Sequence, residues 1–374
     1  MSREGDIARW KIVVFSLIPV LVLFALVELG LRVYVHRQAE LDRGKALPTP
    51  AQRNIYQRPD PVLGYGLTPG YDAGGIRVNA LGFRGPDIVV PKPSGTFRIV
   101  AIGDSTTFGL AGEACPYAAQ LQALLLGRGS DRRFEVVNAG VEGYGSDYAL
   151  RLLETRIGRL QPDVVILFIG WNDLYSTNPF VPNVPRLHED LQEARRLTRH
   201  NAATSGWWIV DSLYTLQFVR RVAYLDLPRF RARFATAAPA RTVGVHPAMI
   251  RVYSNYLTRL ARRTRDLGAI PVFVTLPSVL SANMSSEGLK IVHYPPWARS
   301  DYRLFLQVVD EFNHTIRETS RQERAPLVDA AAVYDQLGLA KEKLFFDACH
   351  MYCAGHGLLA RTFRDELSRQ RAIP

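Results

Sequence analysis

The sequence is poor in cysteine. Only Cys115, Cys349 and Cys353 occur in 374 residues. Three cysteines cannot crosslink a fold that lacks a core, so a disulfide-rich scaffold is excluded. They allow at most one bridge and one free thiol, with Cys115 paired to either of the other two. A hydrophobic share of 47% supplies an ordinary globular core instead.

The sequence also lacks the glycine patterns of nucleotide-binding loops. Gly143-Tyr144-Gly145 has no third glycine at the spacing of a dinucleotide-binding turn, and no P-loop lysine motif is present. Internal repeats and low-complexity tracts are absent as well. We therefore expect a protein without a nucleotide or other cofactor.

Acidic residues are outnumbered by basic ones. The 35 Asp and Glu residues face 46 Lys and Arg residues, which gives a net charge of +11. Such an excess suits nucleic acid, an anionic membrane surface or an acidic glycan. The basic residues do not alternate with aromatic ones, and much of the excess lies between Arg186 and Arg241. This pattern favours a solvated or membrane-facing surface, with an acidic glycan as the alternative, and we expect no nucleic-acid partner.

One apolar run is long enough to cross a membrane. Residues 12–31 could span the ~30 Å hydrocarbon layer as a helix, with a tail at 1–11 before it. Pro19 is tolerated in such a helix, and Glu28 lies near one end, where an acid can reach the interface. A cleaved signal peptide is the alternative, but its apolar stretch is normally shorter and no small-residue cleavage site precedes Arg32. We therefore expect a transmembrane anchor at 12–31.

Basic residues flank this run on both sides, so the positive-inside rule gives no preferred orientation. Because the run is N-terminal and no second run follows, we expect the large domain outside the cytoplasm. Residues 32–95 are rich in Pro and Gly, which predicts a linker and an irregular N-terminal extension.

Strands and helices alternate from residue 97 onward. Apolar runs predict strands at 97–102, 134–138, 163–169, 270–275 and 326–328, and the spacing between them predicts helices at 117–126, 147–160, 247–267, 302–321 and 355–370. Such alternation is typical of a parallel sheet that is covered by helices on both faces. A Pro- and Arg-rich stretch at about 174–245 interrupts the pattern and is predicted to be an insertion.

Three of the predicted strands are followed by residues suited to acyl transfer. Ser105 in Gly103-Asp104-Ser105 follows the first strand, Gly143 the second, and Asn172 in Gly170-Trp171-Asn172-Asp173 the third. Carboxyl ends of parallel strands meet at one edge, so these residues should lie together. There a hydroxyl could act as nucleophile, while an amide and a backbone N–H bind the oxyanion. Singly, each has a simpler explanation, as a helix N-cap or a turn residue.

A serine nucleophile needs a base. Of the eight histidines, only His350 follows a carboxylate, Asp347, by three residues beside a predicted strand-end loop. The acid can fix the ring tautomer while the other ring nitrogen faces Ser105. The alternative is a capping Asp beside an unrelated His.

A metal site is the main rival at this end of the chain. Its potential ligands lie within ten residues, and on a helix three of them, Cys349, Cys353 and His356, would share one face. No second cluster completes such a site, so we expect no metal. We expect His356 to pack or cap near the last helix.

The segments that contain Ser105, Gly143, Asn172 and Asp347–His350 occur in the order found in the SGNH/GDSL hydrolase family. The resemblance covers about residues 97–370, although the first segment is GDSTTFG rather than the longer family signature. The resemblance implies a hydrolase domain at 96–374 with a flavodoxin-like three-layer α/β/α sandwich around a central parallel sheet. It also implies a catalytic triad of Ser105, Asp347 and His350. The implied oxyanion hole consists of the Ser105 and Gly143 N–H groups and the Asn172 side chain.

The chain also resembles bacterial membrane-anchored members of this family. The resemblance rests on the N-terminal apolar run, the Asn-x-x-Gly-Phe-Arg segment at Asn79–Arg84 and the core that follows them. This implies a serine esterase at the inner membrane, with its domain in the periplasm, that acts on an acylated small molecule, glycan or lipid. The favoured substrate is an O-acyl or O-acetyl ester on a carbohydrate or lipid. The alternatives are an O-acyltransferase, or a non-catalytic assembly subunit in cell-envelope polysaccharide modification.

Overall fold

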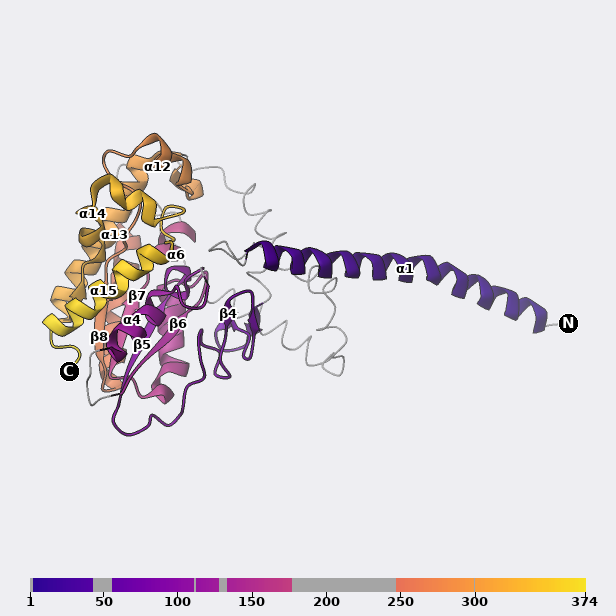
Figure 1. Cartoon of the computed structure of the whole chain (residues 1–374), viewed down its shortest axis with the longest axis horizontal. Coiled ribbons are helices and arrows are strands. Elements are labelled where there is room, and N and C mark those ends of the chain that lie inside the picture. Colours follow the sequence, from indigo (N-terminus) through magenta and orange to yellow (C-terminus); the bar gives the residue numbers. More distant parts are fainter. Residues whose placement is uncertain (1–2, 43–55, 111, 128–132, 177–246, 299) are drawn as a thin grey trace. The chain divides into compact units, whose positions relative to one another are not determined.

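The computed structural model describes residues 3–42, 56–110, 112–127, 133–176, 247–298 and 300–374 (Figure 1). Most of the insertion predicted at 174–245 therefore lies outside the described residues. The chain divides into two compact units, one holding residues 1–55 and the other the sheet. The extension from Tyr56 onward belongs to the unit that holds the sheet. The predicted domain boundaries stay a prediction.

The N-terminal unit contains helix α1 (Arg3–Asp42). Within it, Phe15–Val33 is long and apolar enough to cross a membrane, a test that a signal sequence also passes. This stretch overlaps the predicted span at 12–31. Arg32 pairs with Glu28 one turn earlier at 2.7 Å, which offsets part of the cost of carrying either charge beside an apolar stretch.

The second unit is built on a five-stranded parallel sheet with strand order β6-β5-β7-β8-β9. The strands are β5 (Thr96–Gly103), β6 (Arg133–Gly140), β7 (Val164–Phe168), β8 (Ile270–Val274) and β9 (Leu327–Val328). All five predicted strands are confirmed. This order is that of a flavodoxin-like sheet, whose ligands bind where the strand order reverses, between β5 and β7.

The helices form a layer on each face of the sheet (Figure 1). The chain steps from β5 to β6 in one direction and from β6 to β7 in the other, so right-handed crossovers place α4 and α5 on opposite faces. Helix α15 packs on α4, while α11 contacts α5 and α13. The predicted three-layer α/β/α fold is therefore confirmed. The bounds of these helices are α4 (Tyr117–Leu126), α5 (Ser146–Leu152), α11 (Pro247–Asp266), α13 (Tyr302–Gln322) and α15 (Cys353–Arg369).

Shorter elements complete the unit. The helix predicted at 147–160 is α5 followed by a π-helical turn (Leu153–Ile157) and a 3₁₀ turn (Gly158–Leu160). The extension forms two antiparallel hairpins. The other elements are β1 (Gln57–Asp60), β2 (Gly64–Leu67), β3 (Asp72–Ala73), β4 (Ile76–Arg77), α3 (Ser105–Phe108), α6 (Trp171–Ser176), α12 (Ser286–Ile291), the 3₁₀ turn Pro296–Ala298, α14 (Ala330–Asp335) and the 3₁₀ segment Gly338–Leu344.

Candidate active site

Ser105 opens helix α3 directly after strand β5. The carboxylate of Asp104 caps this helix, accepting hydrogen bonds from Thr106 N at 2.8 Å and Thr106 Oγ1 at 2.7 Å. The capping role considered for Ser105 therefore belongs to its neighbour, and the Ser105 hydroxyl is left for another partner. Burial raises the pKa of Asp104, since a charged carboxyl is disfavoured away from water.

The short helix α3 fits against the sheet because residue 140 has no side chain. A Cβ on Gly140 would lie 2.3 Å from Phe108 N, a distance that no packed structure tolerates. Strand register also sets Gly103 level with Gly140 on one side and with Phe168 on the other. Ser105 is thereby held at the carboxyl edge of the sheet, where the strand order reverses.

The loop after residue 344 folds back on itself around the carboxylate of Asp347. Phe346 N donates to His350 O at 3.1 Å, which closes the loop. Inside it, Asp347 Oδ1 accepts the N–H groups of Cys349 at 2.9 Å and His350 at 2.7 Å. Asp347 Oδ2 lies 2.6 Å from His350 Nδ1. Asp347 therefore caps the loop, which was the alternative explanation for this residue, and it also holds the imidazole.

The structure brings Ser105, His350 and Asp347 into one hydrogen-bonded chain. His350 Nε2 lies 2.7 Å from Ser105 Oγ. An ionised carboxylate only accepts hydrogen bonds, so Nδ1 carries the ring proton and Nε2 is free to accept from the serine hydroxyl. Burial acts to raise the pKa of Asp347, but its hydrogen bonds with His350 and the nearby imidazole hold that pKa below its ordinary value. The carboxylate thus stays ionised at neutral pH.

Of the two other predicted site residues, Gly143 lies in the loop after β6 and Asn172 in the first turn of α6. Asn172 Nδ2 donates to Tyr144 O at 3.0 Å, using one of its two N–H bonds. Gly143 has φ of +84°, a left-handed conformation that glycine adopts without strain. Among the described residues no acceptor takes its backbone N–H. One N–H of each residue thus has no acceptor among the described residues.

Two further residues belong to this arrangement. Asp173 accepts from Ser146 N at 2.9 Å and Ser146 Oγ at 2.5 Å, which joins the start of α5, just after Gly143, to the start of α6, which carries Asn172. Burial raises the pKa of Asp173 to about 7, against the lowering effect of the hydrogen bonds from Ser146. The sequence feature that could have identified Asp173 is its position directly after Asn172. Phe346 stacks on the His350 ring with centroids 5.6 Å apart, a contact that no sequence pattern indicated.

The cysteines contradict one prediction about the metal alternative. Cys353 forms a disulfide with Cys115 and begins helix α15, whereas Cys349 precedes that helix. Cys349, Cys353 and His356 therefore do not share a helix face. The Asp347, Cys349 and His350 ligand atoms do lie within 4.8 Å of one another. Burial and the charge of Asp347 raise the pKa of the Cys349 thiol well above its usual value, so in the absence of a metal ion it is protonated at neutral pH.

His356 is a packing residue, as expected. Its ring is buried in the first turns of α15 and stacks on Tyr117 with centroids 6.3 Å apart. Burial, then electrostatic interactions with Arg84 and with His350, lower the pKa of His356 to about 3. It is therefore neutral at physiological pH, which suits a core position.

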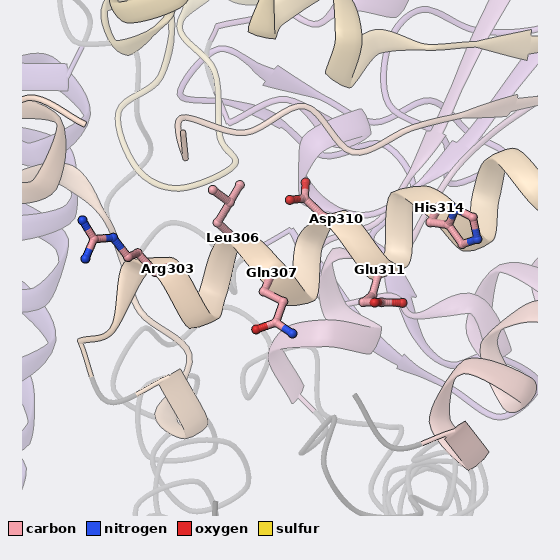
Figure 2. A pocket seen from close by; sticks show the side chains of 6 residues that line it. All are labelled: Arg303, Leu306, Gln307, Asp310, Glu311 and His314. Carbon is pink, nitrogen blue, oxygen red and sulfur yellow. The ribbon is translucent and has the colours of Figure 1, made fainter. Parts of the chain in front are cut away.

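An open hollow of about 530 Å³ lies elsewhere, along the outer face of α13 (Figure 2). Its lining residues all come from this one helix, and most are exposed and polar. The residues are Arg303, Leu306, Gln307, Asp310, Glu311 and His314. None of the predicted site residues lines it, so it is separate from the Ser105–His350 pair.

Comparison with solved structures found chains of similar structure. The structure is similar to the acetylxylan esterase Axe2 from Geobacillus stearothermophilus, with 19% identity, a TM-score of 0.44, and coverage of 72% of this chain and 94% of the other. It is also similar to a putative GDSL-like lipase from Parabacteroides merdae, with 16% identity, a TM-score of 0.45, and coverage of 73% and 95%. No curated protein matches the chain.

The family assignment rests on a sequence match. Residues 101–358, well over half of the chain, match the model of the GDSL-like lipase/acylhydrolase family. The matched range contains all five predicted site residues, from Ser105 to His350. The chain therefore belongs to the GDSL-like lipase/acylhydrolase family and is a hydrolase that acts on ester bonds.

Proposed function

We propose that the chain is a serine esterase that works through an acyl-serine intermediate. The observation that carries this proposal is the hydrogen-bonded chain from Ser105 Oγ through His350 to Asp347. His350 Nε2 takes the hydroxyl proton as Ser105 Oγ attacks the acyl carbon. It then gives that proton to the leaving alcohol oxygen as the ester bond breaks. Water repeats the two steps on the acyl-serine and releases the carboxylic acid.

The oxyanion that forms at each attack needs donors. In this proposal the Ser105 N–H, the Gly143 N–H and the second N–H of the Asn172 side chain bind it. Each preorganised donor is worth on the order of 3 kcal/mol in the transition state. The ionised Asp347 stabilises the imidazolium that exists at the same moment.

The proposed substrate is an O-acyl ester, such as an O-acetyl group, on a carbohydrate or lipid at the outer face of a bacterial inner membrane. Helix α1, if it anchors the chain, would limit the enzyme to substrates near the bilayer. The Cys115–Cys353 disulfide supports the extracytoplasmic side, because disulfides persist in oxidising compartments. A C-terminal reporter that is active only in the cytoplasm would refute this orientation.

The test uses the full chain in detergent with p-nitrophenyl acetate, with and without an oligosaccharide acceptor. We expect prompt hydrolysis without acceptor, and a loss of kcat of about 10³-fold or more in Ser105→Ala and His350→Ala. A fluorophosphonate should label Ser105 in the unmodified chain only. Turnover that requires the acceptor would instead indicate an O-acyltransferase. Undiminished turnover by Ser105→Ala would refute the serine mechanism, and a folded wild type with no turnover and no labelling would favour a non-catalytic assembly subunit.

A further inference from the structure

The peptide between Glu142 and Gly143 presents one of the proposed oxyanion donors. Its carbonyl oxygen, Glu142 O, accepts a hydrogen bond from the Tyr65 hydroxyl at 3.0 Å and a longer one from Gln57 Nε2 at 3.4 Å. The C=O and N–H of one peptide lie in one plane and point in opposite directions. Fixing the direction of Glu142 O therefore fixes the direction in which the Gly143 N–H points.

Tyr65 is itself held firmly in strand β2. Its ring packs edge-on against Tyr144 with centroids 5.2 Å apart and tilted against Tyr148 at 5.3 Å. Its own carbonyl accepts the Tyr144 hydroxyl at 2.5 Å. The hydroxyl oxygen lies 2.6 Å from where a Cβ on Gly143 would stand, so it contacts the donor peptide closely.

The Glu142–Gly143 peptide needs a hydrogen bond from the side on which Tyr65 lies. On its far side, Asn172 binds Tyr144 O and Asp173 binds Ser146, but neither contact reaches the Glu142 carbonyl. Glycine at positive φ leaves the preceding peptide free to rotate unless a hydrogen bond holds it. The hydrogen bonds that Gln57 and Tyr65 donate to Glu142 O both come from the extension that precedes the family core.

We propose that Tyr65 is a positioning residue of the oxyanion hole, acting through the Glu142–Gly143 peptide. Donation to the carbonyl oxygen aims the Gly143 N–H and also polarises it, which strengthens the bond that it donates to the oxyanion. This inference rests on the proposed function, because it assumes that Gly143 binds the oxyanion. The extension from Tyr56 to Leu67 would then complete a site whose catalytic groups all lie in the family core.

The test is Tyr65→Phe in the full chain, which removes one oxygen atom and keeps the ring. We expect kcat for p-nitrophenyl acetate to fall about tenfold with KM nearly unchanged, which is less than the 10²–10³-fold expected for losing a donor outright. Phenylboronic acid, which forms a tetrahedral adduct on a nucleophilic serine, should bind about tenfold more weakly. A purely structural role would not shift inhibitor affinity in step with kcat.

The matched control is Ser320→Ala, which also removes one hydroxyl oxygen. The Ser320 hydroxyl is likewise buried and donates to a backbone carbonyl, Ala325 O, at 2.8 Å, just before the amino end of β9 and thus at the edge of the sheet opposite Ser105. This variant should lose thermal stability with kcat unchanged. If Tyr65→Phe does not fold, Gln57→Ala replaces it, with an expected loss in kcat of about twofold at constant KM, because its bond is longer.

Three outcomes overturn the inference: a folded Tyr65→Phe with wild-type kcat, a loss confined to KM, or an equal loss of kcat in Ser320→Ala. Ser105→Ala is assayed in parallel to separate the two proposals. If Ser105→Ala retains activity, the proposed function fails. If Ser105→Ala is inactive while Tyr65→Phe equals the wild type, only the role of Tyr65 fails.

Discussion

Replacing Asp347 with asparagine should separate the two tasks of this side chain. Its Oδ1 caps the loop by accepting two backbone N–H groups, and its Oδ2 accepts from His350 Nδ1. In Asp347→Asn the amide oxygen can keep both backbone bonds, since the opposite rotamer would place NH₂ against two donors. The amide NH₂ then faces Nδ1, so the ring must carry its proton on Nε2. In that tautomer Nε2 cannot take the proton of Ser105.

The size of the effect follows from the geometry. A carboxylate and an imidazolium whose charges lie about 4 Å apart attract each other by about 4 kcal/mol at an effective dielectric constant of about 20. This attraction exists only once the imidazole is charged, so its loss falls on the transition state. About 4 kcal/mol corresponds to about a 10³-fold loss in kcat. Asp347→Ala should lose a similar factor and, in addition, about 2–4 kcal/mol of stability, because both backbone donors lose their acceptor.

The assay measures kcat and the urea unfolding free energy of both variants beside the wild type. We expect Asp347→Asn to unfold close to the wild type and Asp347→Ala to be clearly less stable, with both nearly inactive. A folded Asp347→Asn that retains more than about a tenth of wild-type kcat would refute the argument, because His350 would then hold its productive tautomer without the carboxylate.

Two other changes test features around the site. The pKa of Asp173 is raised to about 7, so the fold favours its neutral form; this stabilisation is complete below the unfolded pKa of about 4 and is lost as pH rises through 7. The unfolding temperature of Asp173→Asn should therefore decrease less between pH 5 and pH 8 than that of the wild type. Equal decreases in the two proteins would contradict this. Cys115→Ser should destabilise the chain by about 2–5 kcal/mol in urea under non-reducing conditions. The denatured wild type should then expose one reactive thiol, that of Cys349, whereas three would show that no disulfide forms.

The sheet could be predicted from the sequence because its strands are buried on both faces. A short, nearly continuous apolar run such as Val164–Phe168 is typical of a strand that is buried on both faces. The intervals between these runs are long enough for helices. The two hairpins of the extension gave no such signal. Their strands have two to four residues, too few for a periodic pattern, and side chains of the first hairpin bond to distant segments, as Tyr65 does to Glu142 O and Asp60 to Arg156.

The candidate site could be assembled from the sequence for a related reason. Topology places the ends of β5, β6 and β7 side by side, so Ser105, Gly143 and Asn172 converge without any knowledge of side-chain geometry. The Asp347–His350 spacing encodes a local loop, which a short sequence pattern can specify. The pairing of Cys115 with Cys353 rather than Cys349 could not be predicted, because it depends on where α15 begins relative to α4.

Two residues that sequence reasoning missed contact backbone groups. Asp173 binds the N–H of Ser146 as well as its hydroxyl, and Tyr65 binds a carbonyl oxygen. A backbone partner leaves no residue type at the other end of the contact, and therefore no pair for a motif to record. Catalytic side chains can be recognised from their residue type. The groups that orient a peptide N–H depend instead on the path of the backbone in the folded chain. In this fold that path includes the extension before the family core, so the core alone would retain its triad while losing support for one oxyanion donor.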